Sequence, residues 1–265
     1  MPTVEFDTRD FAELVGGDYS LNELEEWIPM IGVGLEHIDE KTIELEVFPN
    51  RPDMLSIEGF ARAFKGFLGR ETSLSSYPVE DSGIVLQVSD SVAGVRPYCA
   101  AAVCRGVRFT ENSLKSLMDI QEKLHTTHGR NRMKVAIGVH DLDTLCPPFT
   151  YKAVEPDSVS FVPLDMGQEL SLRQILSEHP KGRDYAWTLE GKSRWPLFVD
   201  SQDVVLSFPP IINGQHSRLT RDTSNLFIEM TGTSQIALDQ ALNIILSSLN
   251  DRGGDILSVE KRRLK

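Results

Sequence analysis

A polar segment without apolar periodicity, ETSLSSYPVEDSG (residues 71–83), divides the chain into two parts that carry different charge. Residues 1–82 contain 18 acidic and 6 basic side chains, whereas residues 83–265 contain 21 of each. The formal charge of −12 therefore resides in the first third of the sequence. Serine, proline and glycine between periodic segments are typical of a linker, and such charge asymmetry indicates two units with different roles. We predict a domain boundary between residues 82 and 83.

The composition fits a globular protein rather than a membrane or secreted one. Hydrophobic residues make up 40% of the 265 residues and charged residues 25%, which are ordinary values for a chain with a packed core. An apolar stretch such as ALNIIL (241–246) is too short to cross a bilayer. The acidic start MPTVEFDTRD differs from signal and transit peptides, so we expect a cytoplasmic protein without a membrane partner.

The three cysteines, Cys99, Cys104 and Cys146, favour neither a disulfide framework nor a zinc site. Their number is odd, and no CxxC or close Cys/His cluster accompanies them. We therefore expect no metal. The second unit is neutral overall and can carry a local basic face, which keeps a nucleic-acid partner compatible with the acidic total.

The first unit is predicted to be small and α+β. Asp7 or Thr8 can cap a helix, and Ser20 with Glu23 has the spacing of a capping box. Residues 42–47 alternate as a half-buried strand. NRPD (50–53) predicts a turn that leads into a further helix, because proline and aspartate both favour the first helical turn.

The second unit mixes helices and strands without strict βαβ alternation. This pattern predicts an α+β fold with a mixed or antiparallel sheet. Strands are expected within 83–90, 98–109, 135–143, 149–165, 225–233 and 255–263, and helices within 111–129, 171–180 and 234–254. No GxGxxG, GxxxxGK[ST] or GxSxG motif occurs, so the nucleotide-binding loops and the nucleophile elbow are unsupported.

A basic turn, GRNRMK (129–134), follows the first long helix of the second unit. Arg130 and its basic neighbours either lie at a solvated helix C-terminus, where cations interact favourably with the helix dipole, or form a phosphate-binding patch. His140 follows on a strand, with Asp143 three residues later. A histidine beside a carboxylate is often a structural pair, but it can also orient water or a ribose hydroxyl.

The segment SFPPIINGQHSRLT (207–220) interrupts an apolar run with two prolines and Asn213-Gly214. The prolines predict extended backbone, and Asn-Gly predicts a tight turn with positive φ and exposed amides. Downstream, Glu229 interrupts the apolar run LFIEM and shares a strand face with Thr231. A carboxylate in that position either faces solvent or needs a buried partner.

These segments resemble the β subunit of phenylalanyl-tRNA synthetase, of the archaeal and eukaryotic type. NRPDMLSIEGFAR matches the family's B1 domain, and HGRNRMKVAIGVHDLD and FPPIINGQHSRLT…TSNLFIEMTGT match its B3/4 domain. The resemblance implies a B1-like domain over 1–82 and a B3/4 editing domain over 83–265. It further implies hydrolysis of tyrosine wrongly esterified to tRNA(Phe), the α subunit and tRNA(Phe) as partners, and an (αβ)2 holoenzyme. That holoenzyme uses ATP and Mg²⁺, whereas no cofactor is expected for this chain.

The resemblance also assigns roles to single residues. Glu229 would accept a hydrogen bond from the tyrosine hydroxyl, which a pocket for a phenyl ring cannot otherwise distinguish. A catalytic role falls to Asn213, Gly214, Thr231 and His140, and a role in binding the substrate to Glu229, Ser207, Leu197, Gln215 and Arg130. Neither a covalent nucleophile nor a metal is expected, since an activated ester needs chiefly a positioned water and a stabilised oxyanion.

Two other functions compete with editing. The chain could be a non-catalytic scaffold for tRNA binding or subunit assembly, although Asn213, Gly214, Glu229 and Thr231 are all present. It could also be a free-standing aminoacyl-tRNA deacylase, against which the B1-like NRPD unit argues.

Overall fold

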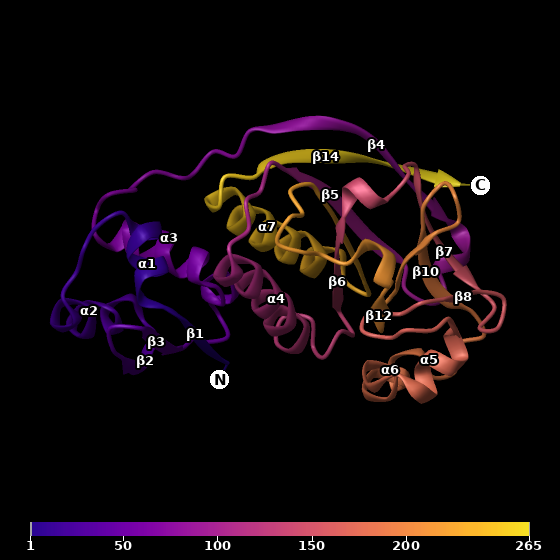
Figure 1. Cartoon of the computed structure of the whole chain (residues 1–265), viewed down its shortest axis with the longest axis horizontal. Helices are drawn as coiled ribbons and strands as arrows, with labels where there is room; N and C mark the ends of the chain where they lie inside the picture. The colour runs from indigo at the N-terminus through magenta and orange to yellow at the C-terminus, as the bar shows by residue number, and fades with distance from the viewer. Residues whose placement is uncertain (1, 265) are drawn as a thin grey trace.

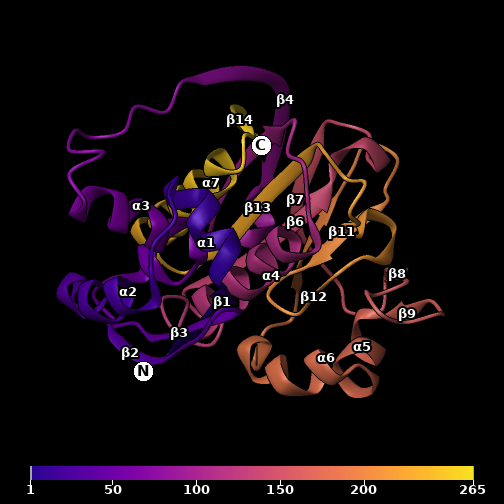
Figure 2. The ribbon, with the colours of Figure 1, turned by 60° about the vertical axis from the view of Figure 1, so that its left-hand side comes forward.

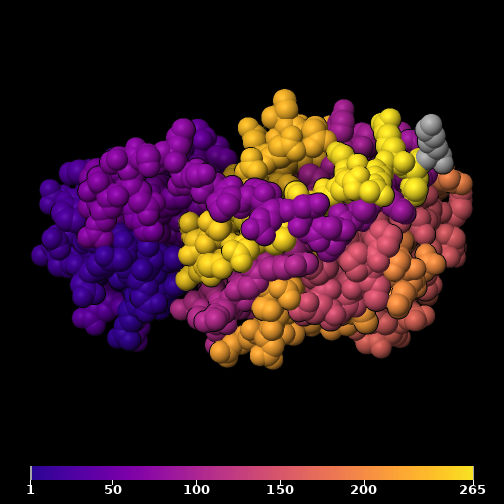
Figure 3. Space-filling view, turned by 90° about the horizontal axis from the view of Figure 1, so that it is seen from above, coloured from indigo at the N-terminus to yellow at the C-terminus, as the bar shows by residue number. Residues whose placement is uncertain are grey.

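The computed structural model describes residues 2–264 and contains a small and a large β-sheet. The small sheet and its helices form one end of an elongated molecule (Figures 1 and 3). Its strands are antiparallel in the order β1 (Thr3–Asp7), β3 (Thr42–Glu46) and β2 (Gly34–Ile38), and its helices are α1 (Thr8–Val15), α2 (Leu21–Trp27) and α3 (Ile57–Phe67).

Local sequence signals explain where these first helices begin. The Asp7 carboxylate accepts hydrogen bonds from the backbone N–H groups of Arg9 and Asp10 and so caps α1. Ser20 and Glu23 form the predicted capping box of α2. Strands β1 and β2 were not predicted, since β1 has only two buried apolar residues and β2 has none.

The large sheet has nine strands and is mixed, which confirms the predicted α+β class. β4 pairs in parallel with β14 and β7, and the other pairs are antiparallel. Across the sheet the order is β12 (Ile212–Asn213), β11 (Val205–Phe208), β10 (Trp195–Val199), β7 (Phe149–Val154), β4 (Val79–Ser89), β14 (Asp255–Leu264), β5 (Tyr98–Arg105), β13 (Leu226–Gly232) and β6 (Val135–Asp141).

Two long helices pack on the sheet beside each other (Figure 2). Helix α7 (Gln235–Asp251) contacts β5 and β13, and α4 (Glu111–Thr126) contacts β6. A separate excursion carries the remaining short elements, β8 (Ser160–Phe161), β9 (Leu170–Ser171), α5 (Leu172–Glu178) and α6 (Pro180–Tyr185). Short 3-10 turns are η1 (Pro29–Ile31), η2 (Pro52–Met54), η3 (Asp90–Val92), η4 (Leu142–Thr144), η5 (Ala186–Leu189) and η6 (Gln215–Ser217). No helix within residues 2–264 is long and apolar enough to span a membrane.

The end of the predicted linker is part of the large sheet. Strand β4 begins at Val79 and pairs with β14 from Ile256 onward. This early part of β4 is mostly exposed and is held by backbone pairing, so its side chains carry no periodic signal. The polar segment therefore connects the two parts only as far as residue 78. The functional division at residue 82 stays a prediction.

A partly buried ion cluster joins the two parts of the chain. Arg252, just after α7, donates to both oxygens of Asp10 at 2.6 and 2.7 Å, and to Glu58 at 2.8 Å. Ser116 of α4 donates to the other oxygen of Glu58. Two acidic side chains of the first unit, Asp10 and Glu58, are thus paired with Arg252 of the second. Both parts also contribute to one continuous apolar core.

Candidate functional site

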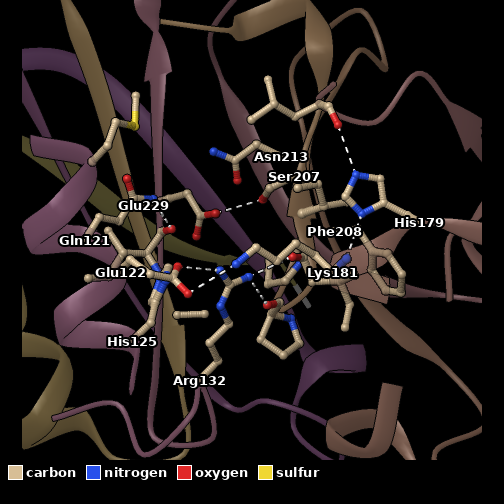
Figure 4. A pocket seen from close by; sticks show the side chains of 18 of the residues that line it. Gln121, Glu122, His125, Arg132, His179, Lys181, Ser207, Phe208, Asn213 and Glu229 are labelled. Atoms are coloured by element: carbon tan, nitrogen blue, oxygen red, sulfur yellow. Dashed lines mark hydrogen bonds and ion pairs between the residues drawn. The ribbon is translucent and has the colours of Figure 1, made fainter. Parts of the chain in front are cut away.

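The central feature of the site is a buried carboxylate in the middle of β13. Glu229 is 2% exposed, and its Oε1 accepts a hydrogen bond of 2.8 Å from Ser207 Oγ on β11 (Figure 4). Its second oxygen, Oε2, is one of four buried side-chain atoms within residues 2–264 that have no hydrogen-bond partner. An unpaired buried acceptor is costly, so a hydrogen-bond donor brought by a ligand would stabilise this oxygen.

His140 of β6 lies behind this carboxylate rather than beside Asp143. Its Nε2 is 3.9 Å from Glu229 Oε1, and its Nδ1 is 2.8 Å from Ser217 Oγ. The ring is fully buried. Asp143 instead accepts two hydrogen bonds from Asn225. The suggested pairing of His140 with Asp143 was wrong, because β6 ends at Asp141 and Asp143 lies in the turn η4 beyond it.

A glycine makes room for this arrangement. Gly138 pairs with Glu229 across β6 and β13. A Cβ atom at Gly138 would come within 2.7 Å of His140 Nε2 and closer still to the Glu229 carboxylate. Only glycine at position 138 leaves room for the side chains of both Glu229 and His140.

Glu229 and Ser207 lie at one wall of a cavity of about 280 Å³. Helix α4, the hairpin of β11 and β12, and the start of α6 provide the other walls (Figure 4). Apolar groups from Met118, Ala136, Ile137, Leu164, Phe208, Pro209, Pro210, Ile211 and Ile212 line most of it. The cavity is thus apolar with a few convergent polar groups, as in most small-ligand sites.

The hairpin has its turn at a different place from the predicted one. Ser207 pairs with Asn213, and Ile211 N–H donates to Phe208 O, so the chain reverses at Pro209 and Pro210. Asn213 lies in β12, and Gly214 has φ of −75°. The predicted Asn-Gly turn with positive φ was therefore wrong. Glycine is needed at 214 for space, since a Cβ there would come 2.5 Å from Val205 O.

The cavity lining contains Glu229, Ser207 and Asn213 but omits several residues that the sequence suggested. Thr231 shares the strand face of Glu229, yet its hydroxyl accepts a hydrogen bond of 2.8 Å from Arg96. Leu197 is fully buried in the core of the sheet. The side-chain carbonyl of Gln215 accepts from Asp165 N–H, and Arg130 is exposed. Leu197 was expected to line the pocket for the ring, and it does not, because neighbouring strands and helices cover it. The roles suggested for Thr231, Gln215 and Arg130 stay predictions.

The cavity contains a charged group that the sequence did not single out. Arg132, rather than Arg130, donates to Pro210 O and Ile211 O and to Glu122 of α4, and it stacks on Tyr185 of α6. Lys181 also pairs with Glu122. The hydrogen bond to His125 and these two cations hold the pKa of Glu122 well below its usual value. The basic turn at 129–134 was the only signal for this group.

His125 connects α4 to β6 in its neutral form. Its Nε2 accepts from the Ile137 N–H at 2.8 Å, which leaves the proton on Nδ1, facing Glu122. Burial lowers the pKa of His125 to about 4, although Glu122 opposes that shift. Within residues 2–264, no group of three or more His, Cys, Asp or Glu residues is placed to hold a metal ion.

A second cavity, of about 670 Å³, adjoins the first. The two share Met118, Gln121, Leu164, Asp165 and Asn213 as lining residues. Other residues border only the second cavity, among them Gly214, Ser217, Lys115, Arg218 and Arg221. Asn213 therefore stands at the junction of a smaller and a larger compartment, both of which have charged side chains in their lining.

Comparison with known proteins identifies the family and the fold. A model of the B3/4 domain matches residues 91–255. Phenylalanine–tRNA ligase β subunits from Methanosarcina barkeri and Archaeoglobus fulgidus are each 46% identical, covering 97% and 98% of this chain but 46% and 47% of the relatives. An N-terminal fragment of the phenylalanyl-tRNA synthetase β subunit from Pyrococcus horikoshii superimposes with a TM-score of 0.95 at 37% identity, covering 99% of this chain and 77% of that fragment.

The chain therefore belongs to the B3/4 domain family. Within it, the chain groups with the N-terminal part of phenylalanyl-tRNA synthetase β subunits, which confirms the resemblance drawn from the motifs. It spans about half the length of the curated relatives it matches.

Proposed function

We propose that this chain hydrolyses the ester of tyrosine wrongly attached to tRNA(Phe). The observation that carries the proposal is Glu229, buried at the wall of a mostly apolar cavity with one oxygen unpaired. A phenol hydroxyl entering there donates to Oε2 while Ser207 continues to donate to Oε1. The arrangement suits a substrate that is an aromatic ring with one hydrogen-bond donor.

The same carboxylate rejects phenylalanine. A phenyl ring in the cavity would exclude water from Oε2 without offering a donor, and leaving a buried acceptor unsatisfied is expensive. Sites built to bind a hydroxyl can discriminate against the analogue that lacks it by roughly 10⁴-fold, whereas a purely apolar pocket discriminates far less. Selectivity for tyrosine thus follows from one charged group with a fixed position.

Ester hydrolysis is assigned to the junction of the two cavities. With the ring beside Glu229, the ester lies towards Asn213, whose side chain borders both compartments. Its amide can donate to the carbonyl oxygen as negative charge develops, or hold the attacking water. Ser207 and His140 serve as positioning residues, because both contact Glu229. This changes the predicted catalytic role of His140, which is fully buried.

The second cavity would take the terminal nucleoside of the tRNA. Leu114, Met118, Val139 and Leu219 offer apolar surface for a base, and Lys115 and Arg221 offer charge for phosphates. In this proposal the chain acts as part of an (αβ)2 synthetase with the α subunit. Deacylation itself uses neither ATP nor Mg²⁺, since the aminoacyl ester is already activated.

A deacylation assay tests the proposal. The purified chain is expected to release tyrosine from Tyr-tRNA(Phe) and to leave Phe-tRNA(Phe) intact, with and without the α subunit. Asn213→Ala should slow the release about 100-fold, as for loss of one oxyanion donor. An intact Tyr-tRNA(Phe) at high protein concentration, under both conditions, would favour the scaffold function instead.

A further inference from the structure

A second buried charge lies beside the strand that carries Glu229 and has no role in the reaction described above. Arg96, in the loop between η3 and β5, is 4% exposed. Its guanidinium donates to Thr231 Oγ1 at 2.8 Å, to Thr231 O at 2.7 Å, to Arg132 O at 2.8 Å and to Met133 O at 3.1 Å. Among residues 2–264, no carboxylate accepts a hydrogen bond from it.

A buried cation without a paired anion is destabilising, even when its N–H groups are all hydrogen-bonded. Burial lowers the pKa of Arg96 to about 10, and Tyr151 and Glu229 oppose that shift, so the guanidinium stays protonated at neutral pH. The two arginine and lysine side chains of the cavity lining, Arg132 and Lys181, both pair with Glu122. Arg96, which pairs with no carboxylate, is therefore the cation that can offset the charge of Glu229. Glu229 lies two residues before Thr231 in β13.

Arg96 also fixes the geometry around the carboxylate. Through Thr231 it holds the strand that carries Glu229, and through Arg132 O and Met133 O it holds the loop that places Arg132 in the cavity wall. Tyr151 OH donates to Arg96 O at 2.8 Å and fixes the arginine in turn.

We propose that Arg96 is the buried counter-charge of Glu229 and a positioning residue for tyrosine selectivity. This inference rests on the proposed function for its kinetic consequence only. The effect on stability that it implies is a property of the folded chain, so it can be tested whether or not the chain hydrolyses an ester.

The kinetic test compares kcat/KM for Tyr-tRNA(Phe) and Phe-tRNA(Phe). Arg96→Met removes the charge, and the selectivity ratio is expected to fall about tenfold or more, whereas Arg96→Lys should keep the ratio within about threefold. Arg194→Met, which alters an exposed pair with Glu155, is the matched control and should leave the ratio unchanged. Equal slowing of both substrates in Arg96→Met, or no rescue by lysine, would show a merely structural role.

The stability test needs no enzymatic activity. Glu229→Gln keeps the shape of the side chain but leaves Arg96 without its counter-charge, so Tm should fall by roughly 5 °C. In an Arg96→Met background, Glu229→Gln should lower Tm by far less. Without this coupling, removing a buried carboxylate with an unpaired oxygen should raise Tm. An unchanged or raised Tm in Glu229→Gln therefore overturns the inference, even if Arg96→Met fails to fold.

Discussion

The ion cluster at Arg252 is partly buried and the carboxylate at Glu229 is fully buried, and the two charged sites differ in how completely their groups are paired. Arg252 meets both oxygens of Asp10 and one of Glu58, and Ser116 takes the other oxygen of Glu58. Glu229 lines a cavity and has one direct donor, Ser207, and one unpaired oxygen. A fully paired buried charge holds elements together, whereas a partly paired one is available to a ligand.

The largest expected effect tests the paired cluster. Arg252→Met leaves Asp10 and Glu58 without their cation, and the free energy of unfolding should fall by about 4 kcal/mol. Denaturant unfolding measures this change, and Arg262→Met, which breaks an exposed pair with Glu260, is the control without a measurable effect. If Arg252→Met instead altered the Tyr over Phe selectivity of folded protein, the proposed contrast between cluster and pocket would be wrong.

The next effect concerns pH at the edge of the pocket. His125 has a pKa of about 4 when folded and about 6.5 when unfolded, so the unfolded state binds the extra proton between these values. Its contribution to stability is complete above pH 6.5 and falls by up to about 3 kcal/mol as pH drops to 4.

Asp251 acts in the opposite direction over part of that range. Burial raises the pKa of its carboxyl to about 6 despite Arg62, so its protonation favours the folded state as pH falls. The His125 contribution is therefore read as the difference in pH dependence between the wild type and His125→Gln. Parallel stability curves for the two proteins would show that His125 does not titrate as described.

A somewhat smaller effect tests the unpaired carboxylate. Glu229→Ala removes the acceptor for the phenol, and the ratio of Tyr-tRNA(Phe) to Phe-tRNA(Phe) hydrolysis should fall about 100-fold, or about 2.7 kcal/mol. Glu229→Asp keeps the charge on a shorter side chain, so the selectivity ratio should fall less than in Glu229→Ala. Selectivity that survives in Glu229→Ala would remove this residue from the recognition of the hydroxyl.

The smallest expected effect sharpens the geometry of the pocket. Gly138→Ala adds one methyl group against Glu229 and His140, and selectivity should fall about tenfold because both side chains must shift. Gly94→Ala is the matched control, since a Cβ there has nothing within 4 Å. Equal selectivity ratios in the two variants would mean that the site tolerates displacement of the carboxylate.

The sequence by itself determined where the first helices begin and which residue types form the site. Asp7, Ser20 and Glu23 begin the first helices because capping depends on spacing along the chain. Period-2 alternation placed Glu229 and Thr231 on one face of a strand, and long motifs indicated the family.

Only the tertiary structure decided which of those residues meet. Strand periodicity gives a face but not the segments that approach it. Nothing in the sequence therefore brought Ser207 of β11 to Glu229 of β13, which are not adjacent in the sheet, or Gly138 to both Glu229 and His140. The same limit explains why Arg132 and not Arg130 lines the cavity, and why Arg96 was missed. Contacts between distant segments depend on how the elements pack, and that packing assembled the pocket.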